Sequence, residues 1–180
     1  MVALIIGDLI NLRALKRIES KQILEWVNNP SLKYWTGTVF PISEIEHEEW
    51  FEKKLNEKVN KLFGIEERKS GNLIGVIGLS NTDLFNKSTE LFTYIGDEQY
   101  CGKGFGTDAI KTLVRFAFEE LNLHRISLVV FSYNTRAIAS YKKVGFVTEG
   151  VLKESLYKGG KYHDKIIMAI LNDRGISEGE

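Results

Sequence analysis

The sequence predicts a mixed α+β fold, in which one twisted and mostly antiparallel sheet is flanked by helices. Three observations support this class. Short β-rich segments follow one another in the middle of the chain, helical apolar spacing occurs on either side of them, and a helix–strand–helix pattern follows. The chain has 180 residues, of which 43% are hydrophobic and 27% charged, as is typical of one globular domain. We expect this domain to span residues 1–171, with a flexible tail over residues 172–180.

The first half is predicted to form a strand, two helices and three consecutive antiparallel strands. These elements are expected over residues 9–15, 18–28, 43–59, 61–66, 73–79 and 90–96. The first helix has apolar residues at helical spacing and should end at Asn29 and Pro30. The second should begin at Ser43, because Glu46 follows at the spacing of a capping box. Turn residues separate the three strands, so consecutive strands should pair.

The second half is predicted to form a helix, a strand, a second helix and a hairpin. These elements are expected over residues 107–121, 126–131, 134–144, 146–156 and 162–170. The continuous apolar run over residues 126–131 predicts a strand buried on both faces. Gly145 should end the second helix, and the glycines between Lys158 and Lys161 predict a tight hairpin turn. The expected total is about seven strands and about four helices.

Charge and composition restrict the partners. Lys plus Arg and Asp plus Glu are both 24, so there is no net positive field to attract nucleic acid or an anionic membrane, and neither is expected as a partner. The single cysteine, Cys101, cannot form an internal disulfide, and no apolar run reaches the ~18 residues of a membrane span. We therefore expect a cytoplasmic protein. His47, His124 and His163 are widely separated, so no metal site is expected.

A glycine-rich segment between a predicted strand and a predicted helix is the most informative part of the sequence. Residues 99–107, QYCGKGFGT, are called the glycine loop below. Alternating glycines let successive N–H groups converge on an anion, and the start of a helix adds its positive end, so a phosphate or pyrophosphate is the expected ligand. The spacing fits neither GxxxxGK[ST] nor GxGxxG. A glycine-rich turn without a ligand is the alternative.

The glycine loop resembles the acetyl-CoA-binding motif Q/R-x-x-G-x-G/A of GCN5-related N-acetyltransferases (GNAT), with Gln99, Gly102 and Gly104 at its fixed positions. Residues 134–146, NTRAIASYKKVGF, resemble the next motif of that family. Residues 123–126 and the segment from Glu149 resemble a branch that includes ribosomal-protein N-terminal, spermidine and amino-sugar acetyltransferases. The resemblance implies a GNAT fold, whose sheet contains a parallel pair of strands that splay apart, and implies acetyl-CoA as co-substrate.

The resemblance also implies which residues hold the coenzyme. The strand before the glycine loop should open its backbone to the pantetheine, and the loop should hold the pyrophosphate. The implied coenzyme-binding residues are Tyr94, Ile95, Gly96, Cys101, Gly102, Lys103, Gly104, Phe105, Gly106, Thr107 and Asn134. Asn134 also fits a plain helix cap, and the two roles are compatible. Cys101 is interpreted as incidental rather than nucleophilic.

Two residues are the candidates for acid–base chemistry in a direct transfer to an amine. Glu90 is predicted to be the base, because it shares a strand face with Tyr94; a solvated surface carboxylate is the alternative. Tyr141 is the implied acid for the departing thiolate, and the alternative is a packed core ring. An ordered water in place of Glu90 remains open.

The acceptor is less constrained by the sequence. Tyr34, Trp35 and Glu90 are the expected acceptor-binding residues, whereas Trp50 fits core packing equally well. We expect a primary amine on a small molecule or a peptide N-terminus. A spermidine-like polyamine is the nearest alternative, since the acidic run over residues 44–49 suits either a polycation or a helix start. A non-catalytic coenzyme-binding sensor is the alternative from another class. A homodimer or larger homo-oligomer remains open.

Overall fold

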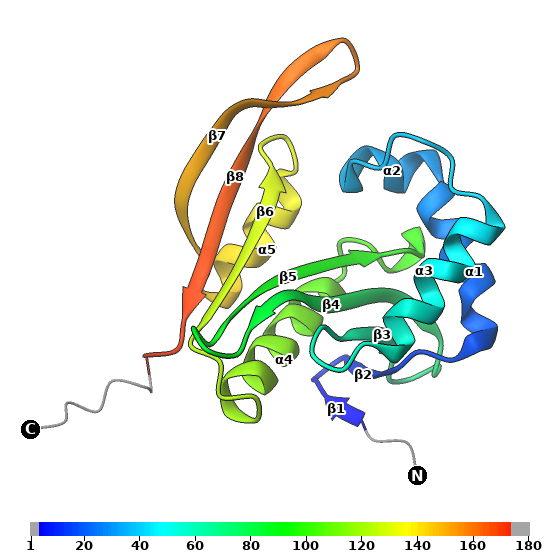
Figure 1. The fold of residues 1–180 in the computed structure, drawn as a ribbon, viewed down its shortest axis with the longest axis horizontal. Helices are drawn as coiled ribbons and strands as arrows, with labels where there is room; N and C mark the ends of the chain where they lie inside the picture. Colours follow the sequence, from blue (N-terminus) through cyan, green and yellow to red (C-terminus); the bar gives the residue numbers. More distant parts are fainter. Residues whose placement is uncertain (1–3, 174–180) are drawn as a thin grey trace, which may run out of the picture.

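One eight-stranded sheet organises the computed structural model, which describes residues 4–173 (Figure 1). The strand order is β1-β2-β3-β4-β5-β6-β8-β7, and every neighbouring pair is antiparallel except β5 and β6, which are parallel. The strands are β1 (Leu4–Ile6), β2 (Ile10–Ala14), β3 (Leu62–Glu67), β4 (Leu73–Asp83), β5 (Ser88–Ile95), β6 (Arg125–Phe131), β7 (Val147–Lys158) and β8 (Lys161–Leu171). The predicted α+β class is confirmed, with eight strands in the described part instead of about seven.

Helices cover both faces of the sheet. They are α1 (Ser20–Asn28), α2 (Pro30–Thr36), α3 (Glu44–Asn56), α4 (Phe105–Glu119) and α5 (Thr135–Val144). One apolar core lies between the sheet and α4 with α5, centred on residues such as Ile77 and Leu113. A second, smaller core lies between the sheet and α1 with α3, centred on Ile23 and Phe51. The two halves of the chain therefore cover opposite faces of the sheet.

The structure adds two elements to those predicted. Residues 29–30 end α1 as expected, but Pro30 also begins α2, and the Asn29 side chain accepts a hydrogen bond from Ser31 N at 2.8 Å. Proline is well tolerated at the first position of a helix, where no intrahelical N–H bond is needed. The expected four helices are thus five α-helices in the described residues. Strand β1 was not predicted, because three residues are too few to show the two-residue alternation of a strand.

One prediction about β6 was wrong. Ile126, Leu128 and Val130 are buried, but Val129 is 53% exposed, so the strand is not buried on both faces. The reason is the short parallel pairing with β5, which covers only residues 88–90 and 125–127. Beyond this point β5 runs across the molecule while β6 and β8 rise away from it (Figure 1). Along the rest of β6, one side of the sheet is left open.

A buried ion-pair cluster fixes the start of α1 against the sheet. The Arg13 guanidinium is 4% exposed and donates to both carboxylate oxygens of Glu19, at 2.6 and 3.1 Å, and to Glu66 at 2.5 Å. Burial opposes ionisation of Glu19, but hydrogen bonds from Arg13 and from Lys16 N–H outweigh it and hold the pKa of Glu19 below its usual value. The cluster therefore joins β2, β3 and the helix that packs beside the end of β5.

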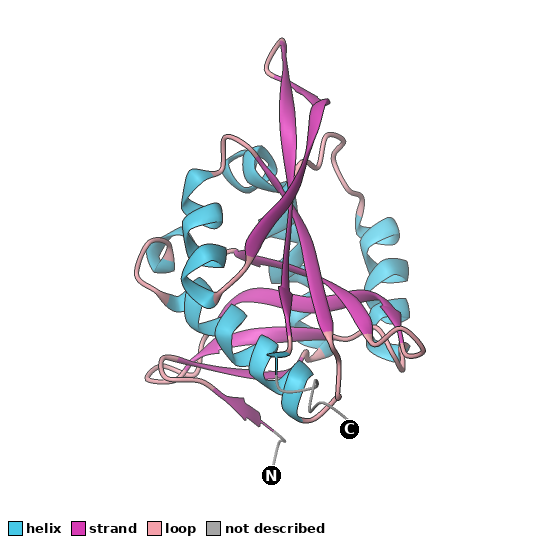
Figure 2. Ribbon diagram, turned by 90° about the vertical axis from the view of Figure 1, so that its left-hand side faces the viewer, coloured by secondary structure: helices cyan, strands magenta, loops and turns pink. Residues whose placement is uncertain are grey.

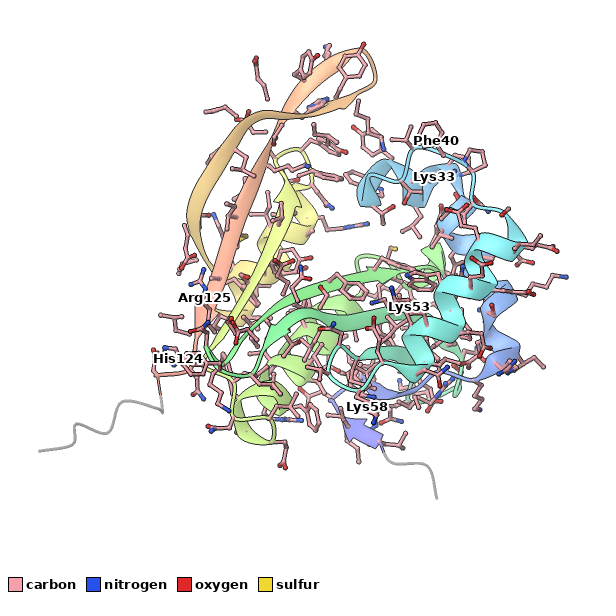
Figure 3. All side chains as sticks on the ribbon, viewed as in Figure 1. Lys33, Phe40, Lys53, Lys58, His124 and Arg125 are labelled. Carbon is pink, nitrogen blue, oxygen red and sulfur yellow. The ribbon has the colours of Figure 1, made fainter. Side chains whose placement is uncertain are left out.

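The β7–β8 hairpin projects beyond the rest of the sheet (Figure 2). Its turn is the predicted one, with Lys158 opposite Lys161. The hairpin side of the molecule contacts α2 at two points: Tyr133 Oη donates to Tyr34 O at 2.8 Å, and Lys158 Nζ donates to Lys33 O. Figure 3 labels Lys33 on α2. These contacts, called the roof below, join the two halves of the chain above the open side of β6.

The predicted tail lies mostly outside the described residues, which end at 173. Its first residue, Asn172, is bonded: its N–H donates to His124 O at 2.8 Å.

Candidate functional site

A cavity of about 950 Å³ opens where β5 and β6 separate; it is called the splay cavity below. Its lining comes from the end of β5, the glycine loop, α5, the end of β6, and residues of α1, α2 and α3. Most predicted site residues line it: Trp35, Tyr94, Ile95, Gly96, Cys101, Gly102, Gly104, Gly106, Thr107, Asn134 and Tyr141. Those outside the lining are Tyr34, Glu90, Lys103 and Phe105.

The end of β5 offers free backbone groups to the splay cavity. Gly96 N–H donates to Ile74 O at 2.9 Å, toward β4. Backbone groups alternate in direction along a strand, so those of Ile95 point the other way, into the gap that β6 leaves. Gly96 also allows close packing, because a Cβ there would lie 2.0 Å from Trp26 Cδ2. The end of β5 is thus held by β4 and α1 while its other edge stays open for an extended ligand.

The glycine loop and the start of α4 form a second wall of the cavity, which carries hydrogen-bond donors. Gly104 is the residue before α4, with φ of +91°, and no side chain caps the helix. The first intrahelical bond is Asp108 N–H to Gly104 O, so the N–H groups of residues 105–107 have no partner within the helix. Together with the positive end of a 15-residue helix, this geometry suits an anionic ligand. Phe105 instead turns inward, with its ring 5.3 Å from that of Tyr100.

Asp108 anchors this helix start, and the sequence patterns did not reveal it. Its buried carboxylate accepts hydrogen bonds from the N–H groups of Asp8, Leu9 and Ile10, at 3.2, 2.7 and 3.2 Å. All three donors lie in or beside the β1–β2 turn, about 100 residues away in sequence, so no local spacing could have identified them. The contact fixes the glycine loop against the far edge of the sheet.

Helix α5 contributes the third wall. The Asn134 side chain accepts from Ala137 N at 3.2 Å, so Asn134 caps the helix while also lining the splay cavity. Tyr141 is 7% exposed, its ring packs against Phe146 at 5.8 Å, and burial raises its pKa to about 12. Tyr141 therefore both packs in the core and faces the cavity as a neutral phenol. Arg136 was not predicted; it lines the cavity with its guanidinium 5.8 Å from the Trp35 ring centre.

Aromatic rings form the wall on the side of α2. Tyr34, Trp35 and Tyr133 lie with ring centres 4.7 to 6.0 Å apart, and Lys158 Nζ is 5.4 Å from the Tyr34 ring centre. Trp35 lines the cavity, whereas Tyr34 packs behind it in the roof. Trp50 lines the cavity and also packs beside the second core.

Glu90 lies at the paired end of β5, opposite Ser127 of β6. Its exposed carboxylate accepts a hydrogen bond from Asn81 Nδ2 at 3.0 Å. It precedes Tyr94 by four residues on the same face, a separation of about 13 Å along a strand. At that distance the Glu90 carboxylate does not contact the open end of β5.

Tyr94 has an unusual side chain in this site. Its hydroxyl is buried and is the one buried side-chain polar atom without a hydrogen-bond partner in residues 4–173. Burial raises its pKa well above the usual range of a tyrosine. The sequence predicted the position of this residue but not the state of its hydroxyl.

The charges of the splay cavity are unevenly distributed. In its described lining, Glu98 is the one carboxylate, and the cations are Arg136 and Lys143 of α5. The acidic run of α3 stays outside: Glu44 and Glu46 occupy its first turn, where Ser43 caps Glu46 N–H at 3.2 Å. Across residues 4–173, no three His, Cys, Asp or Glu side chains are grouped as metal ligands would be. No helix in that range is long and apolar enough to cross a membrane.

Comparisons with known proteins agree with this geometry. Residues 10–147 match the model of the acetyltransferase (GNAT) domain family. The chain is 32% identical over 172 residues to a spermidine N(1)-acetyltransferase of Vibrio cholerae, covering 95% of this chain and 98% of the relative. It is 28% identical over 170 residues to that of Escherichia coli K12, covering 94% and 89%. The crystal structure of spermidine N-acetyltransferase from Vibrio cholerae with CoA and spermine superposes with a TM-score of 0.84 at 32% identity, covering 92% of this chain and 96% of that one.

Proposed function

The chain belongs to the GNAT acetyltransferase family and is an acetyl-CoA-dependent N-acetyltransferase, and we propose that its acceptor is a primary amine of the polyamine class. The observation that carries the transfer chemistry is the splay of β5 from β6, which leaves an open strand edge and a helix start on one cavity. In the proposed reaction, the amine attacks the thioester carbonyl directly. A C–N bond forms, the C–S bond breaks, and the products are an acetylated amine and CoA.

The coenzyme is proposed to lie between β5 and the glycine loop. The open edge at Ile95 supplies backbone groups for the pantetheine amides. The free N–H groups at the start of α4 suit a pyrophosphate, and Arg136 and Lys143 on the neighbouring helix add positive charge.

Tyr141 is proposed to protonate the leaving thiolate. A phenol with a pKa of about 12 stays neutral at physiological pH, so its proton is available when negative charge develops on sulfur. The proton that the amine loses is proposed to leave through water toward Glu90 of β5, whose carboxylate is bonded to Asn81 of β4. Because Glu90 is about 13 Å from Tyr94 along the strand, a relay of ordered water is part of this proposal.

Two features support a polyamine acceptor. Two of the relatives that match over nearly the whole chain are named spermidine N(1)-acetyltransferases. In addition, the Trp35 ring lines the splay cavity and has the Arg136 guanidinium 5.8 Å from its centre, and aromatic faces of this kind suit alkylammonium groups.

A second candidate acceptor is a monoamine or a peptide N-terminus. It is favoured by the single carboxylate, Glu98, in the described lining of the cavity, because a polycation is usually held by several carboxylates.

Acetylation of a panel of amines distinguishes these acceptors. We expect spermidine to release CoA from acetyl-CoA with a kcat/KM at least about tenfold above that of propylamine, since the distal ammonium groups add binding energy. Mass spectrometry of the product should give one added acetyl group. If a peptide with a free N-terminus is acetylated while spermidine gives no product, the polyamine proposal is wrong and the second candidate stands.

The glycine loop is tested by Gly104→Val. A β-branched residue is strained at φ of +91°, so the N–H groups at the start of α4 should turn away and acetyl-CoA affinity should fall at least about tenfold. Titration calorimetry measures it. Gly71→Val is the matched control, because Gly71 has φ of +73° and open space around it, but lies in the turn before β4. Equal acetyl-CoA affinity of Gly104→Val, Gly71→Val and wild type would show that the glycine loop does not bind the coenzyme.

Tyr141→Phe should lower kcat by about 10²-fold and leave the affinity for acetyl-CoA nearly unchanged, because the ring still packs and only the proton donor is lost. Tyr157→Phe, which removes an exposed hydroxyl of the hairpin, is the control. A proton donor is lost as pH rises through its pKa, so Tyr141 should cause no decline in the wild-type rate below about pH 11. A kcat within about twofold of wild type would make Tyr141 a packing residue only.

Glu90→Gln should lower kcat/KM for the amine by about 10²–10⁴-fold near neutral pH. The deficit should shrink as pH rises toward the pKa of a free alkylamine, because neutral amine then becomes abundant without a base. Glu25→Gln, at an exposed position of α1, is the control. A pH–rate profile parallel to that of wild type from pH 6 to 10 would exclude Glu90 as the base.

A further inference from the structure

The buried hydroxyl of Tyr94 has no partner in the described part of the free protein, although its residue lines the splay cavity. A buried hydroxyl without a hydrogen bond opposes folding, and a phenylalanine would fill the same space without that penalty. The surroundings of the ring are apolar: it packs beside the second core, whose members include Trp26, with Trp50 and Phe92 also at its edge. The hydroxyl therefore contributes nothing that holds this fold together.

The position of the side chain indicates which substrate would reach it. The glycine loop, Asn134 and Tyr141 form the walls proposed for the coenzyme. Side chains alternate along β5, and that of Tyr94 lies on the other side, with the core packed against α1 and α3. A partner for the Tyr94 hydroxyl would thus come from the acceptor rather than from the coenzyme.

The chemistry of the Tyr94 phenol limits which role it can have in the reaction. Because burial keeps the phenol protonated, Tyr94 is not a base, but its oxygen can accept one hydrogen bond while its O–H donates another. A primary amine that has lost its ammonium proton still carries two N–H groups and needs its lone pair directed at the thioester carbon. An oxygen that accepts one of those N–H groups would orient the lone pair.

We propose that the Tyr94 hydroxyl binds the acceptor amine, accepting an N–H bond so that the nitrogen lone pair points toward the thioester beside Ile95. Small adjustments of the ring or of the neighbouring Trp50 would bring the hydroxyl to the cavity surface when the acceptor binds. The proposal rests on the proposed amine acetyltransfer and adds the residue that positions the nucleophile. It does not depend on whether the amine belongs to a polyamine.

The test is Tyr94→Phe, which removes only the hydroxyl. Steady-state rates are measured with varied spermidine at saturating acetyl-CoA, then with varied acetyl-CoA at saturating spermidine. We expect kcat/KM for spermidine to fall about tenfold, KM for acetyl-CoA to stay within about twofold, and the thermal midpoint to stay equal or rise, since an unpaired buried hydroxyl has been removed. Tyr162→Phe, an exposed tyrosine of the hairpin, should change none of the three values.

Two results would overturn the proposal. If kcat/KM for the amine stays within twofold of wild type, the hydroxyl does not contact the acceptor in the transition state. If the thermal midpoint falls, the hydroxyl has a stabilising partner in the free protein, such as a buried water, and its role is structural.

A binding measurement separates this proposal from the identity of the acceptor. Spermidine and propylamine are each titrated by calorimetry into wild type and Tyr94→Phe that are saturated with CoA, so that no turnover is needed. About tenfold weaker binding of either amine to the variant supports the contact, even where the polyamine proposal itself fails. Equal affinity of both amines for the two proteins would exclude the contact.

Discussion

The site depends on one constraint, the parallel pairing of β5 with β6 over three residue pairs and no more. Buried backbone N–H and C=O groups need partners, so strands that separate inside a sheet must find them elsewhere. β6 keeps β8 on one edge along its whole length, from Arg125 opposite Leu171 to Phe131 opposite Lys165, and beyond Ser127 its other edge faces the gap. β5 keeps β4 on one edge and leaves the other open. An extended coenzyme can bind along this unpaired edge of β5.

The two halves of the chain supply different walls of this gap. Residues after β5 supply the glycine loop, α4 and α5, the walls proposed for acetyl-CoA. Residues before β3 supply the helices of the opposite face, and the Arg13 cluster fixes their start on the sheet. The roof then joins the halves, through Tyr133 to Tyr34 and Lys158 to Lys33. The halves also meet at the β1–β2 turn, through Asp108, and the splay cavity lies between them.

Local signals predicted the glycine loop, the start of α5 and the β7–β8 turn better than the wall on the side of α2. The alternating glycines, the Asn134 cap and the Lys158–Lys161 turn depend on neighbouring residues, and they were identified from the sequence. Helix α2 was missed because Pro30 was interpreted only as a stop, although proline also begins helices. The exposed face of Val129 and the unpaired hydroxyl of Tyr94 depend on which strands separate and which helices cover them. Packing between elements far apart in the chain produces no periodic pattern in the sequence.

The near absence of carboxylates from the described cavity lining bears on the chemistry. A carboxylate beside an amine favours the ammonium form and raises its pKa, which holds the nucleophile in its unreactive state. Aromatic walls bind a cation more weakly, and an apolar environment lowers the pKa of an amine by penalising its charge. In the proposed complex, Trp35, Trp50 and Tyr94 would surround the attacking nitrogen and Glu98 would be the lining carboxylate, an environment that favours loss of the proton. Glu90, the proposed base, would then have only to receive that proton through water, and would not compete with a charge at the reacting centre.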